Sequence, residues 1–264
     1  MSDEVKVDRA GTTVIVTLAR ERRMNAVGKQ MRAELQEVYT SLRSDSDARV
    51  LVITGEGARA FCVGQDVKET VDRGSVRPRE ERDLLLYSPI FNDVWLPCIV
   101  AVNGVCVGGA FHFLADADII LASKEHASFV DTHTSVGQAS VLEAISLLGR
   151  VGTGSLTKMM VLGSHGPIDA EEAHRINLVD EVVPHERLLD RALELAELIG
   201  RNSPAAIEVS KRALLAAIRG PFAPTFESGW QRLREHWNHP DVLEGARAFA
   251  EKRPPNWHVG RRGS

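Results

Sequence analysis

One short segment restricts the possible folds of this chain more than any other. An apolar run at residues 99–102 leads into Asn103 and Gly104, and the pair Gly108–Gly109 then opens a second apolar stretch that ends at two aspartates. The apolar run is typical of a buried strand, and the glycine pair lets backbone approach a ligand closely. If a helix begins at the pair, its free N–H groups point at whatever lies above them. The segment therefore predicts a strand–turn–helix unit that can stabilise an oxyanion.

A second segment repeats this arrangement. Residues 50–54 form another apolar run, and residues 59–67 follow it with Gly64 placed just past the expected strand. Each loop alone is also typical of an ordinary tight turn between a strand and a helix. Together the two loops can supply one backbone N–H each to a single oxygen, which is the arrangement that acyl-transfer and enolate chemistry require.

Periodicity along the chain predicts an α/β architecture. Strands are expected at residues 12–18, 50–54, 99–102 and 119–122, and a helix at residues 28–42, where apolar residues recur at helical spacing. This order of strand, turn and helix is typical of an α/β fold.

Two other regions have different patterns. Residues 67–94 are charged and lack a clear period, which predicts a surface loop that leads into a helix near residues 84–94. From Ser203 onward only helices are expected, at residues 205–218, 226–237 and 241–252, with Ser203 as the N-cap and Pro204 at the first helical position.

Charge and cysteine content exclude several classes of protein. The formal net charge is −4, and no basic block predicts binding to nucleic acid. We expect no signal peptide at the acidic, polar N-terminus and no membrane span, because no apolar run is long enough to cross a bilayer. The three cysteines, Cys62, Cys98 and Cys106, form no C-x-x-C pair, so we expect reduced thiols in a cytoplasmic protein and no metal site.

As an ordered set, the motifs resemble those of the crotonase superfamily, also called the enoyl-CoA hydratase/isomerase family. They are RRMNA at 22–26, VLVITG at 50–55, FCVGQD at 61–66, AVNG at 101–104, the glycine pair, ADIILA at 117–122, and the run from 170 to 184. The resemblance implies a crotonase-like ββα spiral over residues 1–200, with the acyl-CoA site, and a C-terminal helical trimerisation region over residues 201–264. It also implies a homotrimer, or a hexamer built from two trimers.

The resemblance assigns roles to individual positions. The backbone N–H groups of Gln65 and Gly109 match the oxyanion hole of the family. Coenzyme A is expected only as part of the thioester substrate, with no tightly bound cofactor. The positions that match its binding site are Arg22, Arg23, Met24, Ala26, Cys62, Asp66, Trp257 and Arg261.

The chain departs from the family pattern at the catalytic pair. Typical hydratases carry two glutamates there, and the matching positions are His112 and His133. Taken singly, His112 fits a buried core histidine and His133 a loop residue. Two imidazoles in one pocket suit acid–base catalysis near neutral pH. Either Asp131 or Glu143 can orient an imidazole or act as the carboxylate, and we favour Glu143.

Three functions are compatible with these features. The first is an enzyme of the enoyl-CoA hydratase/isomerase type with a histidine acid–base pair, for which we expect poor hydration of crotonyl-CoA because both glutamates are replaced. The second is a retro-Claisen hydrolase of β-diketones or β-keto thioesters. The third is a non-catalytic acyl-CoA-binding relative, in which His112→Ala and His133→Ala would leave function unchanged.

Overall fold

Two β-sheets form the centre of the computed structural model, which describes residues 4–69, 87–220 and 223–258. Within these residues the larger sheet has six strands in the order β1-β2-β3-β5-β7-β10 and the smaller has four in the order β4-β6-β8-β9. The strands of the larger sheet are β1 Val5–Ala10, β2 Thr13–Leu18, β3 Val50–Gly55, β5 Cys98–Val102, β7 Ile119–Ser123 and β10 Glu181–Val183. Those of the smaller are β4 Ala60–Cys62, β6 Val105–Val107, β8 Ser128–Val130 and β9 Ile168–Asp169.

The chain alternates between the two sheets. It passes from β3 to β4, from β5 to β6 and from β7 to β8, and each time one strand joins the larger sheet and the next joins the smaller. These strands pair in parallel within each sheet, whereas β1 and β2 form an antiparallel hairpin. The α/β prediction and the ββα order are thereby confirmed, as are the strands expected from the apolar runs.

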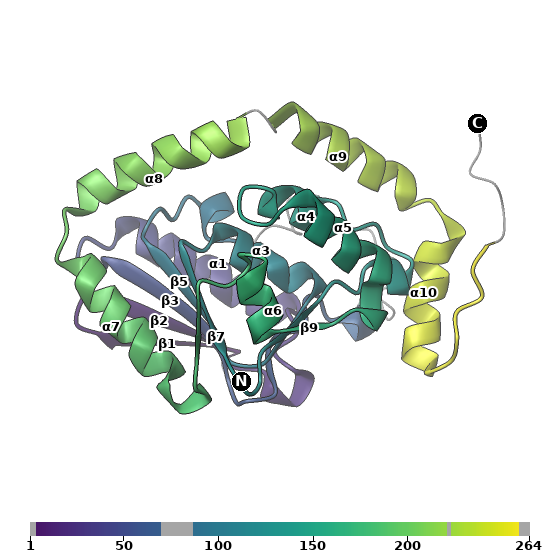
Figure 1. Ribbon diagram of the computed structural model, residues 1–264, viewed down its shortest axis with the longest axis horizontal. Coiled ribbons are helices and arrows are strands. Elements are labelled where there is room, and N and C mark those ends of the chain that lie inside the picture. Colours follow the sequence, from purple (N-terminus) through teal and green to yellow (C-terminus); the bar gives the residue numbers. More distant parts are fainter. Residues whose placement is uncertain (1–3, 70–86, 221–222, 259–264) are drawn as a thin grey trace.

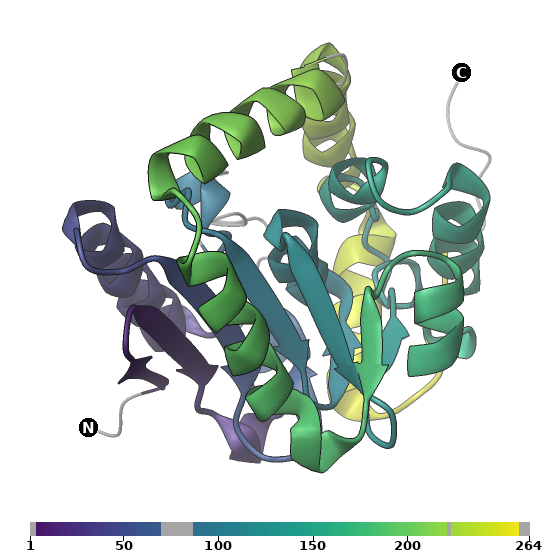
Figure 2. The same ribbon diagram turned by 60° about the vertical axis from the view of Figure 1, so that its left-hand side comes forward.

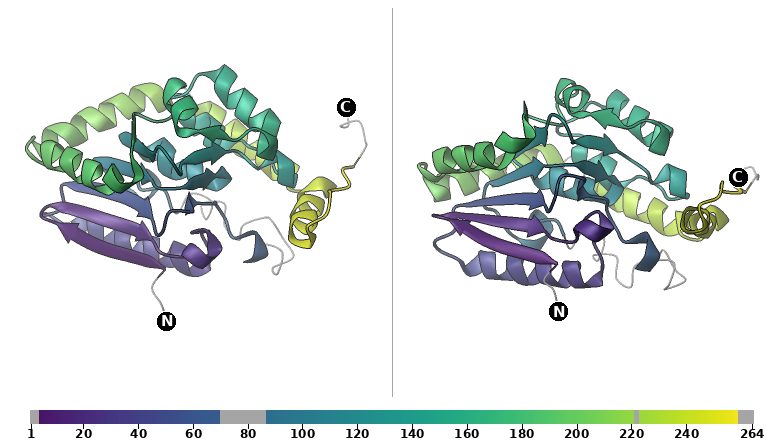
Figure 3. Two further views of the ribbon diagram at one scale, coloured as in Figure 1. Left: turned by 60° about the horizontal axis from the view of Figure 1, so that its bottom comes forward. Right: turned by 90° about the horizontal axis from the view of Figure 1, so that it is seen from below.

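Successive residues of the central strands face opposite layers. On β3, Val50 and Val52 pack with α7 (Leu188–Gly200), whereas Leu51 and Ile53 belong to the main core with α1 (Lys29–Ser44). Figures 2 and 3 show α7 and α1 on opposite faces of the larger sheet. Because both faces are covered, these strands are apolar along most of their length, which explains their continuous runs in the sequence.

Asn103 joins two of the passages between sheets. Its buried side chain follows β5, accepts a hydrogen bond from the Gly55 N–H at 2.9 Å, and donates from Nδ2 to the carbonyls of Gly57 and Ala60. The backbone comes close here, since a Cβ on Gly104 would lie 2.5 Å from the Ala60 nitrogen. Gly104 and Asn103 therefore hold together the two segments in which the chain leaves β3 and β5.

The remaining helices surround this centre. They are α3 Phe111–Asp116, α4 Leu142–Leu147, α5 Thr153–Leu162, α6 Ala170–Arg175, α8 Pro204–Arg219, α9 Ala223–His236 and α10 Pro240–Glu251. In Figure 1, α8 and α9 follow one another across the top of the molecule and α10 descends at the right. The three helices predicted after Ser203 are confirmed, and Ser203 caps α8 by accepting from the Ala206 N–H. Among the described residues no helix is long and apolar enough to cross a membrane.

The prediction of a helix near residues 84–94 is wrong for residues 87–94, which are the part that the structure describes. Residues 70–86 lie outside the described residues, and from Tyr87 onward there is only a 3₁₀ turn, η3 Ile90–Asn92. Asp93 follows it with φ of 58°, in the left-handed region. A right-handed helix cannot continue through this conformation, so the 3₁₀ turn ends after three residues.

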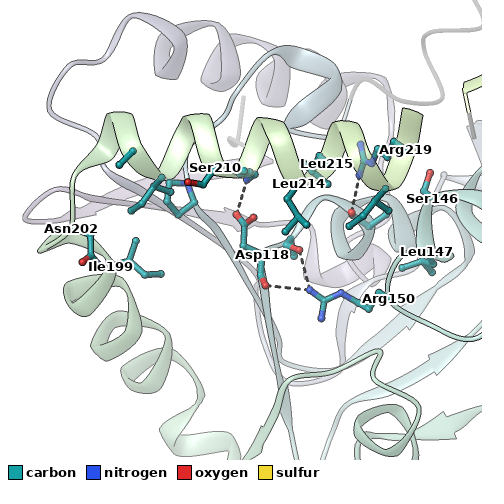
Figure 4. A pocket seen from close by; sticks show the side chains of 18 of the residues that line it. Asp118, Ser146, Leu147, Arg150, Ile199, Asn202, Ser210, Leu214, Leu215 and Arg219 are labelled. Atoms are coloured by element: carbon teal, nitrogen blue, oxygen red, sulfur yellow. Dashed lines mark hydrogen bonds and ion pairs between the residues drawn. The ribbon is translucent and has the colours of Figure 1, made fainter. Parts of the chain in front are cut away.

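Ion pairs attach α8 to the body of the molecule, and two of them are short. Lys211 Nζ lies 2.6 Å from Asp118 Oδ2 and donates to the Leu96 carbonyl at 3.0 Å, and Arg219 Nη2 lies 2.9 Å from Asp116 Oδ1. A cavity of about 730 Å³ lies between α8 and the residues below it (Figure 4), where Asp118 pairs with Lys211 of α8 and Arg219 donates to the Ala115 carbonyl.

Candidate active site

A small cavity of about 90 Å³ brings together four of the residues predicted from the sequence. Gln65, Gly109, His133 and Glu143 all line it, and the C-terminal helices close it through Leu233 and the adjacent Trp237. His112 lies directly behind Glu143 and is 2% exposed. Segments that follow β4, β6 and β8 thus meet at one place, because each leaves the smaller sheet at the same edge.

The two glycine loops touch backbone to backbone. Gly64 has φ of +76°, and a Cβ on it would lie 3.1 Å from the Gly109 nitrogen and 3.0 Å from the Val107 carbonyl oxygen. Only glycine suits both the conformation and this approach. The contact puts the backbones of Gln65 and Gly109 on one wall of the cavity.

The sequence predicts that a helix begins at the glycine pair, but no long helix begins there. A 3₁₀ turn, η4 Gly108–Ala110, comes first, and α3 spans only six residues. The macrodipole of so short a helix is small, so any stabilisation of an oxyanion must come mainly from individual N–H groups.

One carboxylate oxygen serves both histidines. Glu143 Oε1 lies 3.2 Å from His112 Nε2 and 3.4 Å from His133 Nε2. Within the described part of the chain the His112 nitrogen has no well-aligned hydrogen-bond partner, so its contact with Glu143 is mainly electrostatic. Glu143 lies in the first turn of α4 and is 8% exposed, so it faces the cavity from a largely buried position.

Asp131 holds the other side of the His133 ring. Its Oδ1 lies 2.6 Å from His133 Nδ1 and accepts from the His133 backbone N–H at 3.1 Å. Its Oδ2 accepts a hydrogen bond from the Ser140 hydroxyl. Of the two acids that the sequence left as alternatives, both contact His133, one at each ring nitrogen.

These contacts set the protonation states of the cluster. Burial by itself would lower the pKa of His133, but the carboxylates of Glu143 and Asp131 outweigh it and raise the pKa to about 9. Burial would likewise raise the pKa of Glu143, but the charges of His133 and His112 outweigh it and lower the pKa to about 2. The pKa of Asp131 is also lowered, because the hydrogen bond and charge of His133 exceed the effect of burial. At neutral pH an imidazolium therefore lies between two carboxylates.

Sequence reasoning missed several residues of the cavity. Tyr87 is buried, and its hydroxyl lies 2.7 Å from the place that a Cβ on Gly109 would occupy. Its ring meets that of His112 edge to face at 5.7 Å, and its carbonyl accepts from Tyr39 Oη at 2.9 Å. Thr132, Gln138, Leu233 and Trp237 also line the cavity. No local pattern marks these positions, since long-range packing alone brings them to the site.

The residues predicted to bind coenzyme A fall into separate groups. Arg22 and Arg23 are exposed on the 3₁₀ turn η1 Glu21–Arg23, followed by the half-buried Met24 and the buried Ala26. The next residue, Val27, donates to the Gly64 carbonyl at 2.8 Å, so this loop lies beside the segment that carries Gln65.

Cys62 and Asp66 are less available than the sequence suggested. Cys62 is fully buried, and burial raises the pKa of its thiol to about 12, so the side chain is neither exposed nor a nucleophile. Asp66 Oδ2 lies 3.0 Å from Arg20 Nη2, and Arg20 also pairs with Glu4 at 2.8 Å. Arg20 was not singled out from the sequence, because its partners are remote along the chain.

Of the two tail residues assigned to coenzyme A, only Trp257 can be placed. It is 36% exposed and its ring lies 3.0 Å from the position that a Cβ on Gly137 would occupy. Arg261 lies outside the described residues. Within the described ranges no group of three or more histidine, cysteine or acidic residues is arranged to hold a metal ion.

Comparisons with known proteins agree over nearly the whole chain. The family model described as enoyl-CoA hydratase/isomerase matches residues 8–260. (E)-Benzylidenesuccinyl-CoA hydratase of Thauera aromatica is 32% identical over 263 residues, covering 95% of this chain and 97% of that protein. Carnitinyl-CoA dehydratase of Citrobacter koseri is 31% identical over 267 residues, covering 97% and 99%. The crystal structure of carnitinyl-CoA hydratase from Mycobacterium avium, 28% identical, covers 98% of this chain and 100% of its own with a TM-score of 0.85.

Proposed function

The chain belongs to the enoyl-CoA hydratase/isomerase family, and from this premise we propose that it adds water to, or removes it from, an acyl-CoA thioester. In this proposal the backbone N–H groups of Gln65 and Gly109 hold the thioester oxygen while it carries enolate charge. The observation that carries the proposal is the single Glu143 oxygen shared by two imidazoles, in the same cavity as both loops.

The protonation states support separate roles for acid and base. With its raised pKa, His133 holds a proton at neutral pH, and Glu143 is a free carboxylate. During hydration, Glu143 accepts a proton from water as the water oxygen bonds to the β-carbon of a 2-enoyl thioester. The π electrons move towards the thioester oxygen to form the enolate, and His133 then donates its proton to the α-carbon. His112 stabilises the ionised Glu143 from behind.

The same cluster supports the expectation of slow crotonyl-CoA hydration. A carboxylate whose pKa is lowered to about 2 is a weak base, and an imidazolium whose pKa is about 9 is a weak acid. We therefore propose a substrate whose own structure makes hydration easier or whose remote groups bind strongly. Two relatives are named for benzylidenesuccinyl-CoA and carnitinyl-CoA, whose acyl groups are larger than crotonyl, and these names support a larger acyl group here.

A second candidate, retro-Claisen cleavage, is favoured by the short contact between Asp131 and His133. A histidine oriented by an aspartate is a frequent device for activating water. Water would attack a β-carbonyl carbon, the bond between this carbon and the α-carbon would break, and its electron pair would form an enolate that His133 protonates. The raised pKa of His133 counts against it as the base, so Glu143 would have to take the proton from water.

We also propose that coenzyme A enters along the adjoining loops at residues 22–26 and 62–66. Arg22 and Arg23 are the exposed charges there and suit phosphate oxygens. Cys62, being buried, would contribute backbone only, and Asp66 would act through its pair with Arg20. Trp257 and Arg261 remain candidates for the adenine and phosphates.

Assembly into trimers, or into hexamers built from two trimers, is proposed on the basis of α8. Lys211 is its one buried residue among those described, whereas Val209 is 67% and Leu214 is 62% exposed. A second copy of the chain would cover these apolar side chains. Light scattering on the purified protein should give a multiple of the trimer mass, and the double change Val209→Asp and Leu214→Asp should reduce it; a wild-type mass of one chain would contradict assembly.

The function is tested by a substrate panel on wild-type protein and on Glu143→Gln. Hydration of 2-enoyl-CoA thioesters is compared with cleavage of β-ketoacyl-CoA and of cyclic β-diketones. We expect hydration in the wild type and a loss of about 100-fold or more in the variant, which keeps the size of the side chain but not its charge. Cleavage without hydration would favour the second candidate. Binding of thioesters without turnover of any substrate would favour a non-catalytic protein, and an unchanged Glu143→Gln would remove Glu143 from the mechanism.

A further inference from the structure

We propose that Gly245 and His236 are positioning residues, which hold the loop that carries His133 by clamping it against the C-terminal helices. The inference rests on the proposed function, because it takes His133 to be the proton donor. The loop consists of His133 and the 3₁₀ turn η5 Thr134–Val136 with Gly137 after it. The helices α9 and α10 approach this loop from far along the chain, α10 through its backbone and α9 through the side chain of His236.

Gly245 provides the closest approach. It is buried within α10, and a Cβ on it would overlap the carbonyl of Val136 and lie 2.8 Å from the Gly137 nitrogen. The obstructing atoms are main-chain atoms of the loop, so they cannot move aside as a flexible side chain would. Any larger residue at 245 must therefore displace either α10 or the loop.

Gly137 makes the reciprocal contact. Its φ is +70°, and a Cβ on it would overlap the carbonyl oxygen of Asp241 and lie 2.7 Å from the carbon of that carbonyl. A glycine on each element thus faces main chain of the other. Because α10 packs so closely on the loop, the loop backbone has little room to move towards or away from the sheet.

His236 adds a directional bond to this packing. At the end of α9 its Nε2 lies 2.8 Å from the Gly137 carbonyl oxygen, so the ring donates to the loop. Inside the loop, the N–H groups of Val136 and Gln138 donate to the His133 carbonyl at 3.1 and 2.9 Å. The path from α9 to the backbone of His133 is therefore continuous.

The position of this loop decides the surroundings of the His133 ring. The titratable groups that face the ring are Asp131, which precedes it, and Glu143 on α4, with His112 on α3 behind Glu143. From α9 and α10 the loop backbone meets His236 and the Asp241 carbonyl. A shift of the loop changes the distances from His133 to both acids, so it must alter both proton transfer and the titration of the ring.

The first test compares Gly245→Ala with Gly154→Ala. Both glycines lie within helices, but a Cβ on Gly154 in α5 meets nothing within 4 Å, so this variant controls for the better helix propensity of alanine. For Gly245→Ala we expect kcat to fall about 10- to 100-fold, as is typical when a catalytic group is displaced by about 1 Å. We also expect the His133 titration, followed by NMR of the ring, to move down from about 9. Gly154→Ala should match the wild type in both.

A milder pair of variants covers the case in which Gly245→Ala does not fold. His236→Gln can keep a donor near the Gly137 carbonyl, whereas His236→Leu cannot. We expect His236→Leu to lower kcat and to shift the His133 titration, and His236→Gln to restore most of both.

The outcomes separate this inference from the proposed function. If Gly245→Ala or His236→Leu leaves the NMR titration of His133 unchanged, the inference is wrong, whatever the enzyme catalyses. A change confined to KM would mean that the helices only line the cavity, and would also overturn it. If the titration shifts but no acyl-CoA is turned over by the wild type, the clamp stands and the proposed function fails.

Discussion

Each ring nitrogen of His133 faces a carboxylate, with Asp131 on one side and Glu143 on the other. Asp131→Asn removes one negative charge while it keeps the shape and most of the hydrogen bonding. The pKa of His133 should then fall from about 9 towards its ordinary value, by about one unit or more. Because the proposed acid must be protonated, the alkaline limb of the kcat/KM profile should move towards neutral pH by the same amount.

Ser140→Ala is the matched control for that prediction. It removes a hydrogen bond to Asp131 but leaves both charges beside His133 in place. Its alkaline limb should therefore move much less than that of Asp131→Asn. If kcat/KM of Asp131→Asn declines at the same alkaline pH as that of the wild type, Asp131 does not raise the pKa of the acid.

The same charges make folding stability depend on pH. The pKa of His133 is raised, so its contribution is complete below about 6.5 and is lost as the pH rises through about 9. The pKa of Glu143 is lowered, so its contribution is present above about 4.5 and is lost as the pH falls towards 2. These two statements describe one shared interaction and are not additive.

Urea unfolding checks the alkaline half of this dependence. Between about pH 6 and pH 9.5 the wild type should lose up to about 3 kcal/mol more than His133→Gln, which has no charge to lose. Equal losses in the two proteins would mean that His133 does not carry the pH dependence.

Single residues were predicted from the sequence where the motif itself is local. Gln65, Gly109 and Glu143 all line one cavity, because each follows a strand or lies in the first turn of a short helix. Arg20 and Tyr87 were not predicted, since their importance depends on partners that packing brings close from distant parts of the chain. A charged or aromatic residue that belongs to no local motif does not reveal from the sequence which residues it will contact.

At the scale of strands and turns, Asn103 should matter for stability more than for chemistry. Asn103→Ala would remove the partner of the Gly55 N–H and of the Gly57 carbonyl where the chain passes between the sheets, whereas the Ala60 carbonyl would keep its bond from Asn25 Nδ2. We expect a loss of about 2–4 kcal/mol in the free energy of unfolding, measured in urea. Asn103→Asp keeps the acceptor for Gly55 but not the donor, so it should also destabilise; a loss below about 1 kcal/mol for Asn103→Ala would contradict this role.

Elements were predicted best where both faces of a strand are buried or where a helix has a clear apolar stripe. Strands β3, β5 and β7 and helices α1 and α8 agree with the sequence patterns to within a few residues. The helix expected near residues 84–94 failed because the left-handed Asp93 ends the turn that begins at Ile90. Such a conformation depends on packing around the turn and leaves no periodic signal.

Across the whole molecule, the partly buried pair of Lys211 and Asp118 fastens α8 to the sheet. Lys211→Met keeps the apolar stem of the side chain and removes its charge. Since the Asp118 side chain is 34% exposed, we expect a modest loss of about 1–3 kcal/mol in urea unfolding, together with faster hydrogen exchange along α8.

Arg201→Ala is the comparison for that change. Arg201 pairs with Glu197 at the surface, where both side chains are mostly exposed, so its loss should leave α8 exchange unaltered. If Lys211→Met and Arg201→Ala behave alike, α8 is held by something other than the pair of Lys211 and Asp118.

The overall α/β spiral was predictable because its motifs occur in a fixed order along the sequence. The path of α8, α9 and α10 around the outside was not, since amphipathic helices specify which face they bury but not where they dock. The boundary expected near residue 200 remains a prediction, although the three helices predicted beyond Ser203 are confirmed among the described residues.

The bond between His236 and Gly137 spans 99 positions of the chain, and this separation has a consequence for synthesis. A ribosome adds about 5–20 residues per second, so the loop with His133 emerges several seconds or more before the helices that would clamp it. During that interval the nascent chain already contains the segments of β1 to β8 and both glycine loops but has no fixed proton donor. We expect that an unfinished chain can be reached by thioesters in the cell and yet does not react with them.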